Sequence, residues 1–230
     1  MHLGGISKSY RGAPVLKDLT YTFAAGQDYV LMGDNGSGKS TLFRIAALLE
    51  APDQGEVRYL DGPTALPLDI NLKRRITMVF PKVGVLSRSV FDNVAYGLKL
   101  RSRPKEEIQE KVAGYLEKVG LTHKGAQLAT TLSSGETMRM GLARSLAIEP
   151  EVLFLDEPTT HIDKHNTRLI EEVIGRIRQE QALTLIVISH DPAQADRLGG
   201  RRLLLNDGKI VEVKGLPGCG VHAHEDAMRF

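Results

Sequence analysis

Hydrophobic positions along the chain change between the short period of strands and the longer period of helices. Near the amino end, β-rich runs at residues 3–9, 19–23 and 29–32 are separated by turn residues. Glycines then lead into residues 40–50, where apolar positions recur at helical spacing. The apolar face of this predicted helix consists of Leu42, Ile45, Ala46 and Leu49.

The middle of the chain has a helical pattern. Pro104 stands at a first helical position, and residues 135–147 form a further helical stretch. We therefore expect a helical insert over residues 81–144. The apolar residues that follow Pro104 at helical spacing are Ile108, Val112, Leu116 and Val119.

Strands and helices alternate again in the last third. Strands are predicted at 152–155, 184–189 and 202–205, an amphipathic helix at 164–180, and a turn at 206–209 before a last strand. This alternation favours a parallel sheet that is covered on both faces. The predicted fold class is α/β. Its core comprises residues 1–80 and 145–213, and a short tail follows at 214–230.

Composition narrows the classes of function. The chain is 42% hydrophobic and 25% charged, as ordinary soluble globular proteins are. A net charge of +2 and low aromatic content without Trp argue against a nucleic-acid partner. One cysteine, Cys219, excludes an intrachain disulfide and fits a reducing compartment. We expect neither a signal peptide nor a membrane span, so a membrane role requires a partner chain.

Residues 33–41, GDNGSGKST, follow a predicted strand and open a predicted helix, as the G-x-x-x-x-G-K-[ST] pattern requires. Glycines let successive backbone N–H groups curl around phosphate oxygens, and the helix N-terminus adds partial positive charge. Lys39 can pair with the β- and γ-phosphates, and the Ser40 hydroxyl can ligate Mg²⁺. The alternative, a plain glycine-rich turn, fits the context less well. The residues expected to bind ATP here are Gly33, Asn35, Gly36, Ser37, Gly38, Lys39, Ser40 and Thr41.

Residues 152–157, VLFLDE, form a hydrophobic strand that ends in two acids. Ligands of open α/β sheets lie beyond the carboxyl ends of the strands. Adjacent strand residues point to opposite faces, so the two acids need not share a role. We expect Asp156 to hold Mg²⁺ through water and Glu157 to polarise the water that attacks the γ-phosphate. A solvated acid pair is the alternative, which the phosphate loop disfavours.

Residues 132–136, LSSGE, resemble the LSGGQ signature of ABC ATPases, and Arg139 and the segment 142–146, LARSL, follow as in that family. The interval between Lys39 and Ser133 is similar to that of transporter-type members. The resemblance covers residues 6–213 and implies one ABC ATPase domain over 1–230. It also implies a P-loop NTPase (RecA-like) core, an N-terminal antiparallel β subdomain and an inserted α-helical subdomain.

Further roles follow from this resemblance. Tyr10 looks like the aromatic residue that stacks on adenine, with Val15 nearby; a plain edge-strand aromatic is the alternative. Asp163 looks like the aspartate that bridges two nucleotide sites. His190 looks like the switch histidine that contacts the γ-phosphate.

The signature residues imply a second ATPase subunit. Ser133, Ser134, Gly135 and Glu136 would close over the ATP of the opposite chain in a head-to-tail homodimer. Their position at a predicted helix start is itself suited to an anion. Each chain would then supply half of each of two sites.

Three positions depart from the family pattern. Pro81 stands where the family has a glutamine after the predicted strand 76–80, and proline offers no side-chain donor or acceptor. Lys82 could substitute in part for the glutamine, but a cation cannot replace an amide as a metal ligand. Ser134 replaces the middle signature glycine, and Glu136 replaces glutamine. We expect slower turnover than is usual, not inactivity.

The resemblance implies ATP and Mg²⁺ as cofactors, and integral membrane permease subunits and an extracytoplasmic substrate-binding protein as further partners. It implies a cytoplasmic location, peripheral on the inner face of the cell membrane. Segments 89–101 and 163–172 resemble ATPases of oxyanion importers, with tungstate nearest, beside molybdate and phosphate. That is an analogy, because this subunit does not touch the anion.

Two other functions remain open at this stage. One is an ATPase of an export or lipoprotein-release ABC system. The other is a regulatory nucleotide-binding module with weakened catalysis. A separate signal, Cys219 with His222, His224 and Glu225, has metal-ligand spacing, but a solvated tail is the favoured interpretation.

Overall fold

The amino-terminal strands form a three-stranded antiparallel sheet in the computed structural model, which describes residues 1–180 and 182–213. The order is β2–β1–β4, from Ala13–Thr22, His2–Tyr10 and Gln54–Arg58. The buried apolar residues lie three positions apart in each strand, and the pairing of β1 with β2 has register shifts between them. These residues are Leu3, Ile6, Leu16 and Leu19. This sheet confirms the predicted antiparallel part of the fold.

A second sheet of six strands has the order β11–β10–β3–β9–β8–β7. All neighbours in it are parallel except β10 and β11, which form a hairpin. Its strands, in sheet order, are Lys209–Val213, Arg201–Asn206, Asp28–Met32, Thr184–Ile188, Val152–Asp156 and Ile76–Val79.

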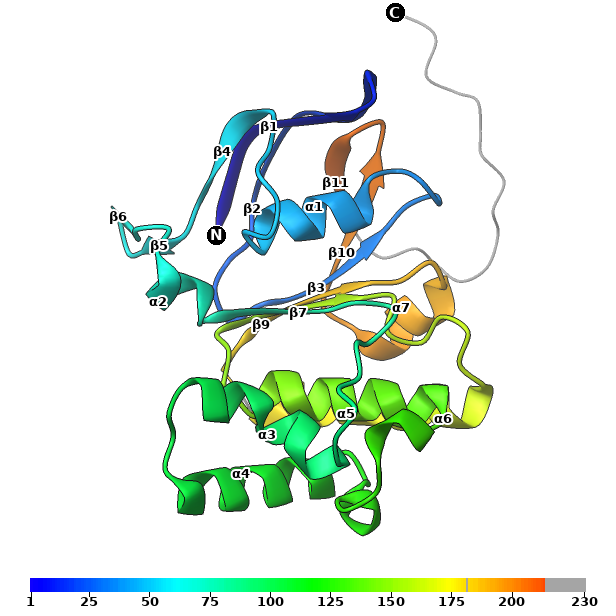
Figure 1. Ribbon diagram of the computed structural model, residues 1–230. Helices are drawn as coiled ribbons and strands as arrows, with labels where there is room; N and C mark the ends of the chain where they lie inside the picture. Colours follow the sequence, from blue (N-terminus) through cyan, green and yellow to red (C-terminus); the bar gives the residue numbers. More distant parts are fainter. Residues whose placement is uncertain (181, 214–230) are drawn as a thin grey trace, which may run out of the picture.

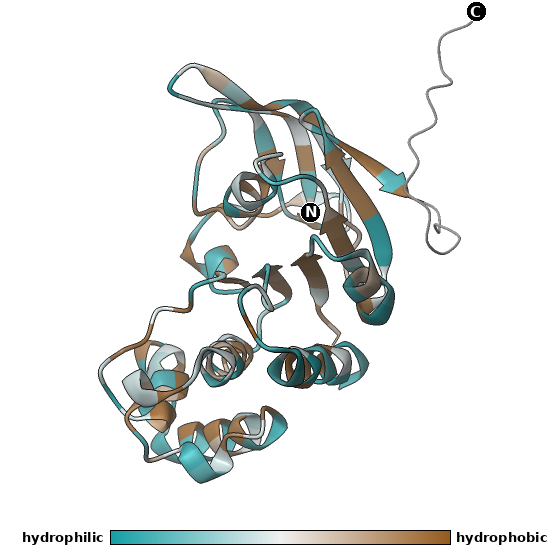
Figure 2. Ribbon diagram, turned by 90° about the vertical axis from the view of Figure 1, so that its right-hand side faces the viewer, coloured by the Kyte–Doolittle hydropathy of each residue, from teal (hydrophilic) through white to brown (hydrophobic). Residues whose placement is uncertain are grey.

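Two apolar cores cover the two faces of this sheet. In β8, Leu153 and Leu155 face the core shared with the helical layer, whereas Phe154 faces the core shared with β1, β2 and α1 (Lys39–Ala46). The central strands β8 and β9 are buried along their whole length, as a parallel sheet covered on both faces requires. Figure 2 shows these strands in brown between helices whose outer faces are teal.

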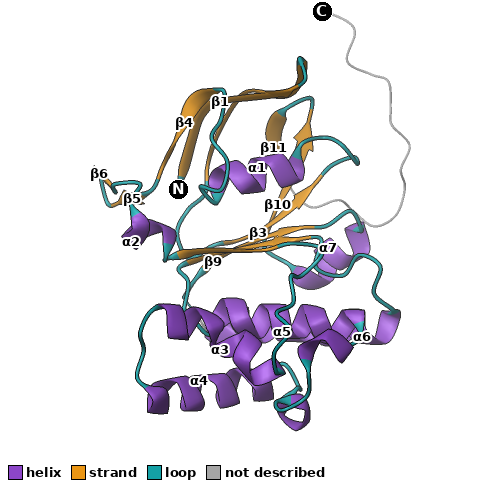
Figure 3. Cartoon of the chain, in the orientation of Figure 1, coloured by secondary structure: helices purple, strands orange, loops and turns teal. Residues whose placement is uncertain are grey.

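Figures 1 and 3 show α1 between the two sheets and a helical layer on the opposite face of the six-stranded sheet. This layer contains α3 (Val90–Leu100), α4 (Lys105–Lys118), α5 (Ser134–Leu146) and α6 (Lys164–Glu180). The predicted domain boundary at residue 144 falls within α5, and the division into subdomain ranges stays a prediction.

Short elements complete the described chain. They are β5 (Leu60–Asp61), β6 (Thr64–Ala65), α2 (Ile70–Lys73), α7 (Pro192–Leu198) and the 3₁₀ turns η1 (Thr122–Lys124) and η2 (Ala129–Thr131). Across residues 1–180 and 182–213, no helix is long and apolar enough to span a bilayer. Residues Cys219, His222, His224 and Glu225 lie outside the described ranges.

Several predicted boundaries were wrong. The helix after the phosphate loop ends at Ala46, because Leu48 adopts a left-handed φ of 59° and the Leu49 amide bonds back to the Arg44 carbonyl. Leu49, predicted to be on the buried face, is 58% exposed. Strand β2 begins at Ala13 because it pairs with β1 from the turn onward. Pro104 is the N-cap residue of α4 and not its first helical residue.

Candidate functional site: a phosphate loop at the carboxyl edge of the sheet

The loop between β3 and α1 requires glycine at defined positions. Gly33 and Gly38 have φ of 147° and 100°. A Cβ atom at Gly33 would lie 2.5 Å from the Leu205 carbonyl oxygen, and one at Gly38 would lie 2.8 Å from Val15 Cγ1. Both glycines therefore combine a left-handed backbone with a close approach that excludes a side chain.

Lys39 is the first residue of α1 and is only 5% exposed. Its ammonium group donates hydrogen bonds to the carbonyl oxygens of Gly33, at 2.9 Å, and Asp34, at 2.8 Å. The loop thus curls around the head of the lysine. A cation held inside a loop of backbone N–H groups is suited to a polyphosphate.

Ser40 and Asp156 meet from α1 and the carboxyl end of β8. The Ser40 hydroxyl donates to Asp156 Oδ1 at 3.2 Å. Asp156 is 3% exposed, and burial raises the pKa of its carboxyl; the Ser40 hydrogen bond offsets part of this rise, and the charge of Glu157 adds to it. A buried carboxylate beside a hydroxyl is an oxygen donor set that fits Mg²⁺, because a cation relieves the cost of burying the charge.

Glu157 follows directly and points toward a different set of partners. Its backbone has a left-handed φ of 46°, which a non-glycine residue seldom adopts. Glu157 Oε2 accepts a hydrogen bond from Thr160 Oγ1 at 2.8 Å and lies 3.7 Å from His190 Nδ1. The acid and the histidine expected at the reaction centre are therefore neighbours.

One pocket unites half of the site residues that the sequence singled out; we call it the phosphate-loop pocket. Its volume is about 250 Å³. Ser37 lines an adjoining cavity that shares Val15, Asn35 and Gly36 with it. Tyr10, which borders the pocket, is 39% exposed. The pocket is lined by Tyr10, Val15, Asn35, Gly36, Gly38, Lys39, Ser40, Thr41 and Glu157.

The signature residues lie apart from this pocket. Ser133 caps α5, and its hydroxyl accepts from the Glu136 amide while Glu136 Oε2 accepts from the Ser133 amide. Ser133 and Ser134 are exposed, and Lys124 forms an ion pair with Glu136 at 2.6 Å. That hydrogen bond from Lys124 is the main reason that the pKa of Glu136 is lowered. Figure 1 places α5 and α1 on opposite faces of the sheet.

Asp163 lies just before α6 and is exposed. Its Oδ1 accepts from the His165 and Asn166 amides at 3.0 Å, and its Oδ2 accepts from Asn166 Nδ2 at 2.7 Å. Asn166 also fills the space beside the signature, since a Cβ on Gly135 would lie 2.5 Å from Asn166 Cγ. Asn166 therefore connects the Asp163 loop to the signature helix.

Pro81 lies at the same edge of the sheet. It follows β7 closely, and the parallel register pairs Val79 with Leu155 of β8, so the chain leaves β7 level with the Asp156–Glu157 pair. Pro81 itself is exposed. Further along the same loop, the side chain of Asn93, from α3, bonds to both the amide and the carbonyl of Leu86.

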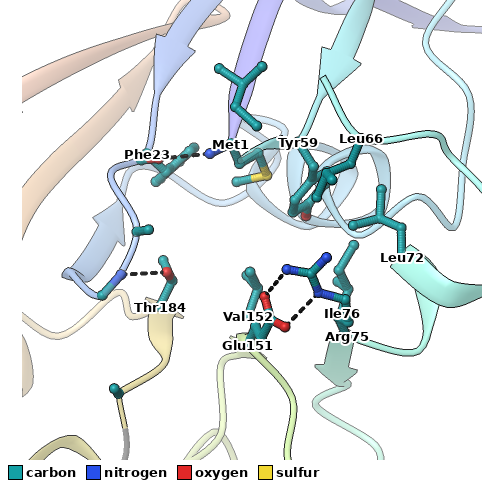
Figure 4. A pocket seen from close by; sticks show the side chains of 14 residues that line it. Met1, Phe23, Tyr59, Leu66, Leu72, Arg75, Ile76, Glu151, Val152 and Thr184 are labelled. Carbon is teal, nitrogen blue, oxygen red and sulfur yellow. Dashed lines mark hydrogen bonds and ion pairs between the residues drawn. The ribbon is translucent and has the colours of Figure 1, made fainter. Parts of the chain in front are cut away.

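A second cavity, of about 240 Å³, lies at the opposite, amino edge of the same strands (Figure 4). Ile76, Val152 and Thr184, the first residues of β7, β8 and β9, line it. Arg75 Nε donates to Glu151 Oε1 at 2.6 Å across it. None of the residues that the sequence singled out lines this cavity.

Two residues with contacts at the site were not found from the sequence. Thr160 hydrogen-bonds to Glu157, and Asn166 links Asp163 to Gly135. Thr160 lies three positions after Glu157, a spacing that could have suggested a local turn contact. The contact of Asn166 with Gly135 joins distant segments, and no local pattern reveals it.

Comparison with known proteins identifies the class that this fold and pocket define. The ABC transporter family matches residues 16–160. The tungstate uptake system ATP-binding protein TupC of Peptoclostridium acidaminophilum is 39% identical over 93% of this chain and 97% of its own length. The molybdate/tungstate import ATP-binding protein WtpC of Thermococcus kodakarensis is 38% identical over 91% of this chain and 63% of its own length.

Two solved structures have the same fold. A dimeric ATP-binding cassette in a post-hydrolysis state with ADP and Pi superposes with a TM-score of 0.80 at 27% identity, covering 94% of this chain and 99% of that one. The cbiO1 protein of Clostridium perfringens, part of the cbiONQ ABC transporter complex, also gives 0.80 at 27% identity, covering 91% and 86%. The chain belongs to the ABC transporter family and is an ATPase, which confirms the prediction from its motifs.

Proposed function

We propose that this chain is the ATP-hydrolysing subunit of an importer for an oxyanion, with tungstate or molybdate as the cargo. The observation that carries this proposal is the match to TupC, at 39% identity over 97% of that protein. Other relatives carry the names of phosphate and methionine importers, at 36% and 35% identity. The ranking of these identities favours tungstate as the cargo.

Different residues at the phosphate-loop pocket bind the phosphates, the adenine base and the metal ion of Mg-ATP. Lys39 releases the Gly33 and Asp34 carbonyls and pairs with the β- and γ-phosphates, while the loop amides bind phosphate oxygens. Tyr10 stacks on adenine beside Val15. Ser40 and Asp156 hold Mg²⁺, which when bound neutralises charge on the phosphates.

Glu157 accepts the proton of the attacking water. His190, 3.7 Å from the Glu157 carboxylate, contacts the γ-phosphate and helps to orient that water. Thr160 donates a hydrogen bond to the same carboxylate oxygen, Oε2, at 2.8 Å, and so limits the rotamers of Glu157 in the absence of nucleotide.

The chain works as a head-to-tail homodimer. Ser133, Ser134, Gly135 and Glu136 lie apart from the phosphate-loop pocket of their own chain and cover the ATP of the other subunit. The exposed Asp163 bridges the two sites. Permease subunits anchor this dimer at the inner face of the cell membrane, and an extracytoplasmic binding protein delivers the anion.

Cellular metal content tests the cargo. The Glu157→Gln variant replaces the wild-type gene in the source organism, and tungsten, molybdenum and phosphorus are measured by mass spectrometry after growth in defined medium. We expect tungsten or molybdenum to fall while phosphorus is unchanged. A fall in phosphorus alone, or no change in any of the three elements, contradicts the proposed cargo.

A further inference from the structure

The hydroxyl of Tyr10 is held by two charged residues, Arg44 in the last turn of α1 and Glu50 in the segment that follows this helix. Tyr10 Oη donates to Glu50 Oε1 at 2.6 Å and accepts from Arg44 Nη2 at 3.0 Å. Arg44 Nε donates to Glu50 Oε2 at 2.9 Å, which closes a three-membered ring of hydrogen bonds. Tyr10 ends β1, which is the central strand of the three-stranded sheet, so the alternative interpretation as an edge-strand aromatic was wrong. Water alone would satisfy an exposed tyrosine hydroxyl, and neither charged partner is needed for that.

The same set of hydrogen bonds extends to a residue of the phosphate loop. Arg44 Nη2 donates to Thr41 Oγ1 at 3.1 Å, and Thr41 lines the phosphate-loop pocket. Tyr10, which lies 34 positions before Arg44, is thereby tied to the helix that begins with Lys39. The aromatic ring and the phosphate-binding helix form one connected unit.

Lys8 supports this arrangement from the β1 side. Its ammonium lies 3.3 Å from Glu50 Oε1 and 5.7 Å from the centroid of the Tyr10 ring. Burial raises the pKa of Glu50, but hydrogen bonds from Tyr10, Arg44 and Lys8 outweigh it and hold the pKa below its ordinary value. Glu50 therefore stays ionised at neutral pH and remains a hydrogen-bond acceptor for the tyrosine.

We propose that Glu50 and Arg44 are positioning residues that fix the Tyr10 ring for the nucleotide base. The inference rests on the proposed stacking of Tyr10 on adenine. A ring on an exposed strand end rotates about χ1 and χ2, and ordering it on binding costs conformational entropy. Two charge-assisted hydrogen bonds fix the position of the hydroxyl, and with it χ1 of the side chain, before the nucleotide arrives.

Glu50 should affect the binding of the adenine base and not the binding of the triphosphate. A variant without the Glu50 charge should bind ATP more weakly, whereas its affinity for inorganic tripolyphosphate should be unchanged. The ratio of the two dissociation constants isolates the base contribution. A general loss of folding would weaken both ligands together.

Calorimetry of the full chain with Mg²⁺ and either ATP or tripolyphosphate measures this ratio. Tyr10→Ala should weaken ATP binding by about tenfold. Glu50→Gln and Tyr10→Phe should each weaken it by about threefold, the effect of one hydrogen bond. The double variant should show no loss beyond the single ones, because both changes break the same contact.

Asp53→Asn is the matched control. Asp53 accepts from Lys8 Nζ at 3.0 Å and from the Ser9 amide at 2.7 Å, but it is not among the hydrogen-bond partners of Tyr10 within the described ranges. This variant should leave both affinities unchanged. An equal fall for Asp53→Asn would mean that the effect comes from Lys8 or the β1 backbone and not from the contact of Glu50 with Tyr10, and the proposal would be overturned.

The outcomes distinguish the stacking of Tyr10 on adenine from its positioning by Glu50. If Tyr10→Ala leaves the affinity ratio unchanged, the stacking of Tyr10 and its positioning by Glu50 are both wrong. If Tyr10→Ala weakens ATP binding relative to tripolyphosphate binding but Glu50→Gln does not, stacking stands and the positioning role is overturned. Additive losses in the double variant would also overturn it.

Discussion

The hydroxyl of Ser40 donates a hydrogen bond to the carboxylate of Asp156 at 3.2 Å, although 116 positions separate the two residues in the chain. Ser40 is on α1, which covers one face of the six-stranded sheet, and Asp156 ends β8 within that sheet. The contact brings the end of the phosphate loop to the acidic pair. It also explains why Asp156 can be almost fully buried.

Replacement of Asp156 by Asn should stabilise the nucleotide-free protein. The raised pKa of Asp156, due mainly to burial, means that the native state holds this proton more tightly than the unfolded state does. The stability of the parent therefore falls as pH rises through the raised pKa. Above it, the cost of the buried charge is fully present. We expect a Tm higher by a few degrees at neutral pH and a flatter dependence of Tm on pH.

Thermal melts with and without Mg-ATP complete that test. The parent should gain stability from Mg-ATP, and Asp156→Asn should gain much less, since an amide is a weaker Mg²⁺ ligand than a carboxylate. Ser40→Ala serves as a matched control that removes the hydroxyl and keeps the charge. An Asn variant that melts lower than the parent at neutral pH contradicts the assigned cost of burial.

Replacement of Lys39 by Ala should weaken ATP binding at least tenfold. The ammonium is held by two loop carbonyls and is the one side-chain cation lining the phosphate-loop pocket among the described residues. Charge-assisted hydrogen bonds of this kind are each worth roughly 1.5–3 kcal/mol. Calorimetry with ATP measures the effect, and an unchanged affinity would remove this loop from the phosphate site.

Replacement of Gly135 by Ala should impair both folding stability and ATP turnover. The new Cβ would lie 2.5 Å from Asn166 Cγ, so Asn166 must move and its hydrogen bond to Asp163 is lost. Overpacking of this kind costs roughly 1–3 kcal/mol. Ser134→Ala, at the exposed neighbouring position, is the control and should leave stability unchanged. Urea unfolding and steady-state ATPase rates measure both effects; equal stability of the Gly135→Ala variant and the parent contradicts the predicted clash.

Replacement of Pro81 by Gln should raise the rate of hydrolysis and leave ATP affinity nearly unchanged. The register of β7 with β8 brings this position to the edge of the sheet where Asp156 and Glu157 lie. A positioned amide orients water and metal better than bulk solvent does, whereas triphosphate binding rests on Lys39 and the loop amides. ATPase rates with and without the membrane subunits measure the effect. If the Gln variant hydrolyses ATP more slowly than the parent in both settings, Pro81 does not lower the rate of hydrolysis and the prediction is wrong.

Elements with a strong local pattern could be predicted from the sequence. The amphipathic stretch 164–180 is α6 with the same ends, and the apolar run 184–189 contains β9. The end of α1 could not be predicted, because the left-handed Leu48 interrupts an apolar pattern that continues to Leu49. Helix α3, which depends on capping by Ser89, was also missed.

The residues of the site also fall into those that a local motif predicts and those that it does not. The phosphate loop and the acids at the end of β8 have motifs with fixed spacing, and the pocket contains both Lys39 and Glu157. The partners of these residues come from other parts of the chain. The contact of Arg44 with Tyr10 depends on the placement of α1 against β1, which no local pattern encodes.

We propose that Glu157 acts as the base in ATP hydrolysis by a dimer of this chain. The Glu157→Gln variant keeps the size and hydrogen-bonding shape of the side chain but cannot take a proton. Steady-state hydrolysis of saturating Mg-ATP, measured together with molar mass by light scattering, tests the claim directly. We expect undiminished ATP binding, loss of hydrolysis and a stable ATP-bound dimer; hydrolysis at the parental rate would show that Glu157 is not the base.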